Sequence, residues 1–77
     1  MIEDLRHNYR AFRETVQKDQ YIIEKPYVIT RMSLAKHEIE LDFNFPIDCV
    51  LKDLIQIHFY GAKITYIGYP HRVIIVI

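Results

Sequence analysis

Several residue types are scarce in this chain. It has one cysteine, two glycines and no tryptophan, and its ten basic and ten acidic residues cancel to a formal net charge of zero. A single cysteine excludes a disulfide within the chain and is typical of proteins from a reducing cytosol. Zero net charge weakens the argument for a general affinity toward nucleic acid or an anionic membrane surface. The composition therefore excludes a disulfide-stapled domain and a polybasic binder.

Long apolar runs are also missing. The longest is Val73–Ile77, far shorter than the roughly 20 residues that a membrane-spanning helix needs. The N-terminus is acidic, with Glu3 and Asp4, and does not resemble the basic and then apolar start of a secretory signal. Of the 77 residues, 51% are hydrophobic and 26% are charged, which indicates one globular domain. We expect a cytoplasmic location and no membrane contact.

The first half of the chain predicts a helix and two strands. Apolar residues recur at steps of three and four from the N-terminus onward and predict a helix over residues 3–19. The helix would extend to Glu24 if Ile23 continues this apolar stripe. Residues 27–32 are mostly β-branched or aromatic, and residues 37–43 alternate strictly between polar and apolar, so both segments predict strands.

The second half predicts a helix and a hairpin. Pro46 and Gly61 mark the start and the end of a helix over residues 46–60. The segments Lys63–Ile67 and Arg72–Ile77 then predict a hairpin. This order predicts a two-layer α+β domain with a mainly antiparallel four-stranded sheet packed by two helices. The second helix joins two strands in a β-α-β step, which allows those two strands to run parallel.

The C-terminal hairpin has more apolar residues than one face of a sheet can bury. With Ile67 opposite Arg72, its side chains divide by parity between two faces. The core face would hold Ile64, Tyr66, Val73, Ile75 and Ile77. The other face would still hold Ile67, Ile74 and Val76, and leaving them in water would forfeit roughly 1.5–3 kcal/mol each. We expect this face to be covered, either by helices packed on opposite sides of the sheet or by a second copy of the chain or another partner. The last strand is expected inside the sheet or paired across an interface.

Two aromatic residues near the end of the second helix suggest a contact surface. Counted from Ile47 at about 100° per residue, Phe59 and Tyr60 point away from the predicted apolar stripe. That stripe consists of Ile47, Val50, Leu51, Leu54 and His58. Phe59 and Tyr60 either contact a protein target or cover the turn that follows the helix.

Three arginines share one flank of the first helix. Arg6, Arg10 and Arg13 follow at steps of four and three, and three guanidinium groups in a row suit binding to phosphates of a nucleic acid. The structural alternative is a solvated flank in which Arg6 pairs with Glu3 and Arg10 pairs with Glu14. Acids on the same helix cancel its net charge.

No constellation of catalytic or metal-binding residues stands out. Cys49 and His58 point in different directions on the predicted helix, so they do not pair as nucleophile and base. The histidines, His7, His37, His58 and His71, are dispersed and lack metal-ligand spacing. His58 is expected to be a buried neutral side chain. The sequence predicts a non-enzymatic binding or regulatory protein, without cofactor or metal, that self-associates as a homodimer through its C-terminal strand. Nucleic-acid binding is the alternative.

Overall fold

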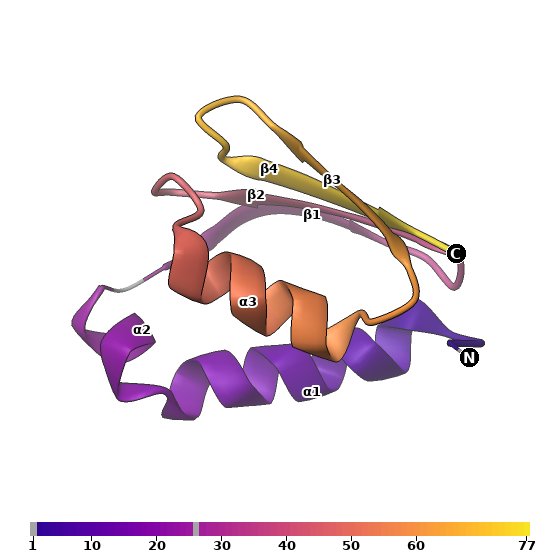
Figure 1. The fold of residues 1–77 in the computed structure, drawn as a ribbon, viewed down its shortest axis with the longest axis horizontal. Coiled ribbons are helices and arrows are strands. Elements are labelled where there is room, and N and C mark those ends of the chain that lie inside the picture. The colour runs from indigo at the N-terminus through magenta and orange to yellow at the C-terminus, as the bar shows by residue number, and fades with distance from the viewer. Residues whose placement is uncertain (1, 26) are drawn as a thin grey trace.

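The helices and strands follow one another along the chain in the predicted order, with one short helix added after the first. The computed structural model describes residues 2–25 and 27–77. Its elements are α1 (Leu5–Lys18), α2 (Gln20–Glu24), β1 (Ile29–Leu34), β2 (Glu38–Phe43), α3 (Cys49–His58), β3 (Lys63–Ile67) and β4 (Arg72–Val76) (Figure 1). The predicted α+β class is confirmed. None of the helices in the described residues is long and apolar enough to cross a membrane.

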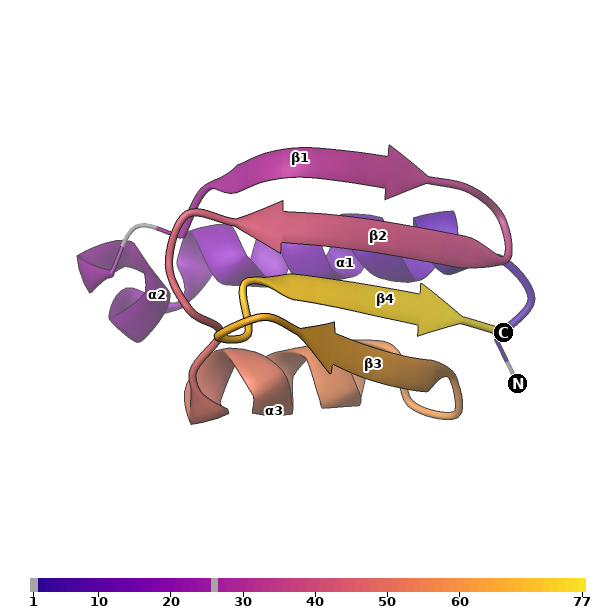
Figure 2. The same ribbon diagram turned by 90° about the horizontal axis from the view of Figure 1, so that it is seen from above.

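The four strands form one antiparallel sheet in the order β1-β2-β4-β3 (Figure 2). β2 and β3 run in the same direction, as a β-α-β step allows, but β4 lies between them and pairs with both. The predicted hairpin register is confirmed, since Ile67 lies opposite Arg72 and Ile64 lies opposite Ile75. The C-terminal strand is therefore interior to the sheet.

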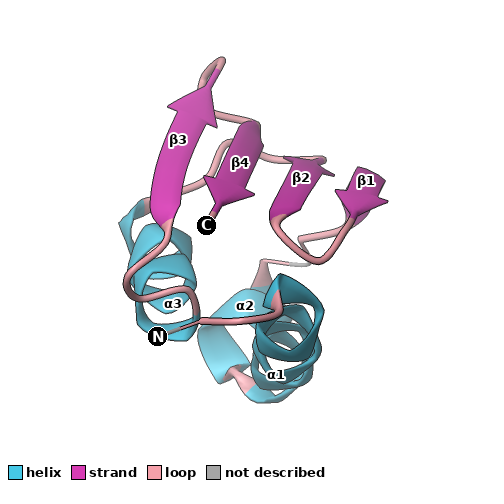
Figure 3. Cartoon of the chain, turned by 90° about the vertical axis from the view of Figure 1, so that its right-hand side faces the viewer, coloured by secondary structure: helices cyan, strands magenta, loops and turns pink. Residues whose placement is uncertain are grey.

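All three helices lie on the same side of the sheet (Figure 3). The hydrophobic core fills the space between the two layers and includes Leu5, Phe12, Ile39, Leu41, Leu51, Ile55, Phe59, Val73 and Ile75. The opposite side of the sheet, which we call the outer face, is not covered by any described helix. The alternative in which helices pack on opposite faces of the sheet is therefore wrong, because both long helices bury their apolar stripes against each other and one sheet face.

Two aspartates divide the first helical segment. The Asp4 side chain accepts a hydrogen bond from the N–H of Arg6 (3.0 Å) and caps α1. Asp19 has an extended backbone that ends α1, and its side chain caps α2 by accepting from the N–H of Ile22 (3.2 Å). This break shifts the apolar face by one residue, so that Ile22 is buried and Ile23 is exposed. The predicted continuation of the stripe through Ile23 is wrong.

The second long helix begins later than predicted. Asp48 caps α3 by accepting from the N–H of Leu51 (2.9 Å), so Ile47 is buried outside the helix. The helical phase counted from Ile47 is therefore wrong. The buried side chains follow at steps of four from Leu51 through Ile55 to Phe59, and each is fully buried. Phe59, predicted to face outward, lies in the core.

Candidate interaction surfaces

One half of the outer face is a ladder of ion pairs. Arg72 of β4 donates from Nε to Oδ1 of Asp42 (2.7 Å) and from Nη2 to Oδ2 (3.2 Å). Arg31 of β1 donates from Nη2 to Oε1 of Glu40 (2.9 Å). The hydrogen bonds from the Arg72 guanidinium hold the pKa of Asp42 below its ordinary value. The charges over β1 and β2 are thus already satisfied within the chain.

The other half of the outer face, over β3 and β4, is mixed and carries three apolar side chains. Ile67 of β3 is 44% exposed, while Ile74 and Val76 of β4 are half-buried. The register places Thr65 opposite Ile74 and Lys63 opposite Val76. Ile67 and Ile74 are therefore diagonal neighbours across the two strands, and Ile74 and Val76 are neighbours on the same face of β4. We call Ile67, Ile74 and Val76 the apolar patch. The structure brings together these three residues, as predicted from the alternation of β3 and β4.

The remaining residues of the predicted interface lie elsewhere. Tyr60 is 79% exposed, but it follows α3 in the helical layer and borders a hollow beside Asn8 and His7 of α1. Phe59 contacts Phe12 inside the core, with ring centroids 5.8 Å apart. Neither residue belongs to the outer face. Phe59 is removed from any contact surface by its burial.

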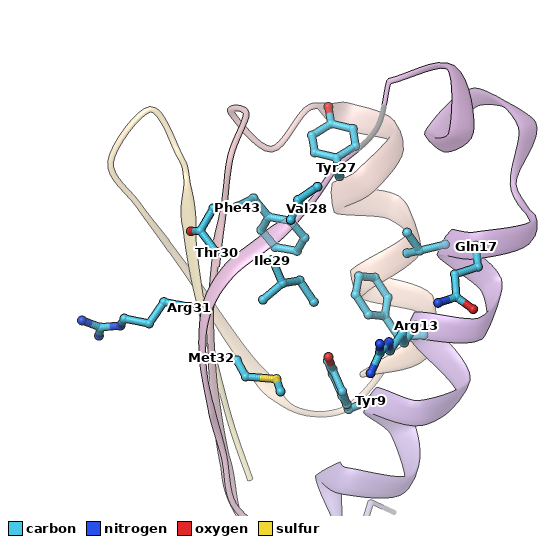
Figure 4. A pocket seen from close by; sticks show the side chains of 12 residues that line it. Tyr9, Arg13, Gln17, Tyr27, Val28, Ile29, Thr30, Arg31, Met32 and Phe43 are labelled. Carbon is cyan, nitrogen blue, oxygen red and sulfur yellow. The ribbon is translucent and has the colours of Figure 1, made fainter.

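A groove that the sequence did not indicate separates α1 from β1. It has a volume of about 500 Å³, and its walls include Tyr9, Arg13, Val16 and Gln17 of α1 together with Ile29 and Met32 of β1 (Figure 4). Side chains of β1 on this inner side of the sheet are poorly covered, since Met32 is 49% exposed and Leu34 is 40% exposed. We call this hollow the α1–β1 groove. Its position depends on β1 being an edge strand, and the order of strands could not be derived from the sequence.

The arginine flank of α1 is only partly available for binding. Arg6 is held by Asp4, with Nη2 2.8 Å from Oδ2 and Nε 3.0 Å from Oδ1. Glu14, the expected partner of Arg10, pairs instead with Lys18 (2.8 Å). Arg10 and Arg13 are exposed and form no ion pair with any residue in 2–25 or 27–77. Two unpaired guanidinium groups therefore remain of the predicted three.

A carboxylate that looks catalytic in isolation has a structural role. Asp48 accepts hydrogen bonds at Oδ2 from the hydroxyls of Tyr21 (2.9 Å) and Tyr27 (2.8 Å), while Oδ1 caps α3. Burial alone would raise the pKa of Asp48, but the Leu51 N–H and the two tyrosine hydroxyls outweigh it and lower that pKa. Burial and the bond to Asp48 raise the pKa of Tyr27 to about 12. Asp48 thus ties the start of α3 to α2 and to the segment before β1.

Cys49 and His58 occupy opposite ends of α3. Ten residues make up this helix, so the two side chains are separated by about 13 Å along its axis. The His58 ring packs edge-on against Phe12 with centroids 5.9 Å apart, and burial lowers its pKa. Cys49 is a free, exposed thiol. Across residues 2–25 and 27–77, no three side chains of histidine, cysteine, aspartate or glutamate gather where they could hold a metal ion.

No protein-family model, no curated protein and no solved structure matches this chain. The described residues offer an apolar patch on the outer face and an apolar groove at the β1 edge, which is lined in part by the unpaired Arg13. These surfaces are suited to binding a partner.

Proposed function

We propose that this chain is a small non-enzymatic binding protein that forms a homodimer through the outer faces of two sheets, with the apolar patch at the centre. The observation that carries the proposal is the position of this patch. Ile67, Ile74 and Val76 lie on the side of the sheet that no described helix covers. Burying them against a second copy removes apolar surface from water without any rearrangement of the fold.

The geometry of the outer face suits a symmetric dimer. Two sheets pack face to face about 10 Å apart, and a two-fold axis brings the same patch of both copies into contact. The ion pairs over β1 and β2 would then lie at the rim, where charged side chains keep their water. The hairpin β3–β4 would supply the dry centre.

Charge does not oppose this arrangement. The outer face carries three basic and three acidic side chains, Arg31, Lys63, Arg72, Glu38, Glu40 and Asp42. Two neutral faces with charges of both signs approach without net repulsion.

The apolar patch alone supports at most a weak dimer. Six partly exposed side chains, three from each copy, contribute about 1.5 kcal/mol each or about 9 kcal/mol together, against an association cost of about 4–15 kcal/mol. The net gain is at most about 5 kcal/mol, so we expect a dissociation constant of about 0.2 mM or higher.

Light scattering from micromolar to millimolar protein concentration tests the proposal. The wild-type chain is expected to reach the mass of a dimer, and the pair Ile67→Thr and Ile74→Thr is expected to remain a monomer. Threonine keeps the β-branched shape that suits a strand. The matched control is Ile57→Thr, because Ile57 is exposed on α3, away from the outer face.

Two outcomes contradict the dimer. One is a wild-type monomer at millimolar concentration. The other is a dimer that Ile57→Thr dissociates and the paired β3–β4 substitutions do not.

Two features support a non-enzymatic protein of the cytoplasm. The separation of Cys49 from His58 along α3 leaves the thiol without that base. The single free thiol fits a reducing compartment such as the cytoplasm.

Nucleic-acid binding through α1 takes second place. In the row of three arginines, Arg6 forms an ion pair with Asp4, so only Arg10 and Arg13 are left to contact phosphates. Two contacts of this kind provide only a small share of the electrostatic affinity of a nucleic-acid binder.

A further inference from the structure

The α1–β1 groove and the free edge of β1 form a second surface, separate from the apolar patch. We propose that this surface binds an extended segment of a partner protein that carries carboxylates. The segment adds to the sheet as a fifth strand beside β1, and its alternate side chains enter the groove.

The backbone of β1 provides the first part of the argument. β1 is an outermost strand and pairs only with β2, so the backbone groups on its other edge are unpaired within the sheet. The register shifts between Ile29 and Arg31 and then runs regularly from Arg31 to Leu34. An added strand has this regular stretch to pair with, as in β-strand addition by peptide-binding domains.

Uncovered apolar side chains provide the second part. On the inner side of the sheet, Met32 lies opposite Leu41 and Leu34 lies opposite Ile39. The β2 residues are fully buried, while their β1 neighbours are close to half exposed. Apolar side chains of an added strand would cover Met32 and Leu34 from the open side and pack over the flank of α1.

Polar groups in the groove define the chemistry of the segment. Tyr9 is 4% exposed as a residue, but its hydroxyl is not a buried atom and forms no hydrogen bond with any residue in 2–25 or 27–77. The Tyr9 hydroxyl and the Arg13 guanidinium both reach into the space between α1 and β1 (Figure 4). No aspartate or glutamate lines the groove. A carboxylate accepts hydrogen bonds from a hydroxyl and from a guanidinium and neutralises the latter, so it suits this pair of donors.

The same charges argue against a second copy of the chain as the occupant. Pairing of β1 with β1 of another copy would place two α1 flanks side by side, each with the unpaired Arg13 that lines the groove. Like charges brought together in this way repel, and no acid of the groove compensates them. The groove therefore fits a partner of opposite charge, whereas the neutral outer face fits a copy of itself.

Nuclear magnetic resonance with capped synthetic peptides tests the proposal. One peptide repeats valine-threonine-glutamate-threonine, so that valine and glutamate share the face that meets the groove. A second has lysine in place of glutamate, and a third repeats the first with N-methylated backbone amides. The glutamate peptide is expected to shift the amide signals of β1 and of α1 around Arg13. The lysine peptide lacks the carboxylates, and the N-methylated peptide cannot pair along the strand edge, so both are expected to leave these signals in place.

Substitution of Arg13 sharpens the test. Arg13→Ala removes a charge-assisted hydrogen bond and is expected to weaken binding of the glutamate peptide about tenfold. Arg13→Glu is expected to reverse the preference toward the lysine peptide. The matched control is Lys63→Ala, because Lys63 is an exposed cation on β3, far across the sheet, and it is expected to leave the affinity unchanged.

Several outcomes overturn the proposal. These are equal binding of the glutamate and lysine peptides, equal binding of the N-methylated peptide, and no shift of β1 or α1 signals at millimolar glutamate peptide. A single-stranded oligonucleotide that shifts α1 signals in a salt-dependent way, when the peptide does not, favours the nucleic-acid alternative and also overturns it. The double variant with Ile67→Thr and Ile74→Thr, which is expected to be monomeric, is expected to bind the glutamate peptide as tightly as the wild-type chain. Loss of the dimer is therefore distinguished from loss of peptide binding at the groove.

Discussion

The two hairpins of this sheet leave apolar surface on opposite sides. β1–β2 is charged on the outer face, where Arg31 and Asp42 join the ladder of ion pairs, but its inner side is open at Met32. β3–β4 is covered on the inner side, where Val73 and Ile75 are fully buried, but its outer face carries the apolar patch. Each hairpin thus has one side whose side chains are ion-paired or buried and one side with uncovered apolar side chains.

The difference comes from the widths of the two layers. Two long helices lie under four strands, and together they bury β2 and β4 more completely than the edge strand β1 (Figure 3). Because the helical layer does not extend under the whole of β1, the groove opens there. Apolar surface that a small domain cannot bury internally is informative about partners, since isolated exposed apolar side chains are common but adjoining ones are not.

The largest expected effect compares inner side chains of the two hairpins. Ile75→Ala creates a cavity in a fully buried site and is expected to lower the free energy of unfolding by about 3 kcal/mol, whereas Met32→Ala is expected to lower it by less than about 1 kcal/mol. Urea denaturation measures both values. Where Ile75→Ala fails to fold, Ile75→Val is expected to cost about 1 kcal/mol. Equal losses at positions 75 and 32 would mean that β1 is covered as well as β4.

The next effect concerns the connection between the hairpins. Asp48→Ala removes a helix cap and two tyrosine hydrogen bonds, and we expect a loss of about 2 kcal/mol in the free energy of unfolding. Asp53→Ala is the matched control, since Asp53 is exposed on the same helix and forms no ion pair with the described residues. A similar loss in both variants, measured by urea denaturation, would show that helix charge rather than the link to Tyr21 and Tyr27 matters.

Acid is expected to weaken the fold in two steps. The folded-state pKa of His58 is lowered by burial, so the folded chain binds fewer protons and stability is lost as the pH falls below 6.5. The pKa values of Asp42 and Asp48 are also lowered in the folded chain, so a second loss begins as the pH falls through 3.8. Each step is smaller than truncation of Asp48, because protonation leaves the side chain in place. Thermal unfolding between neutral pH and pH 5 checks the first step, which His58→Asn is expected to remove.

The smallest effect belongs to the ion pairs of the N-terminal hairpin. Asp42→Asn is expected to lower the free energy of unfolding by less than about 1 kcal/mol, because pairs at the surface are screened by water and salt. Glu38→Gln is the control, since Glu38 is exposed on the same strand face and has no ion pair among the described residues. Urea denaturation at low and high salt measures the difference. A loss that persists unchanged at high salt would contradict a screened surface interaction.

Local patterns predicted the C-terminal hairpin residue by residue. β3 and β4 alternate, and their turn includes Gly68, whose φ of 90° favours glycine, so parity alone assigned Ile74 to the outer face and Ile75 to the core. The α3 face was predicted incorrectly, because Ile47 is apolar and buried without being helical. Counting Ile47 as part of the helix rotated the predicted buried face, and Phe59 was therefore assigned to the outward side.

The α1–β1 groove was beyond prediction for a different reason. Tyr9, Arg13 and Met32 each fit an ordinary amphipathic helix or strand, and only the placement of β1 at the sheet edge makes them neighbours. Strand order is a tertiary property that no local periodicity encodes. The same holds for Asp48, whose two tyrosine partners come from distant segments.

The central position of β4 has a consequence for synthesis of the protein. β2 and β3 do not touch, and the strand that bridges them is translated after both. A nascent chain that reaches only to Ile67 therefore contains two separate strand groups with exposed edges, and the sheet becomes continuous only when β4 pairs with both β2 and β3. The complete sheet therefore cannot assemble during translation until β4 is available, and β2 and β3 keep unpaired edges up to that point.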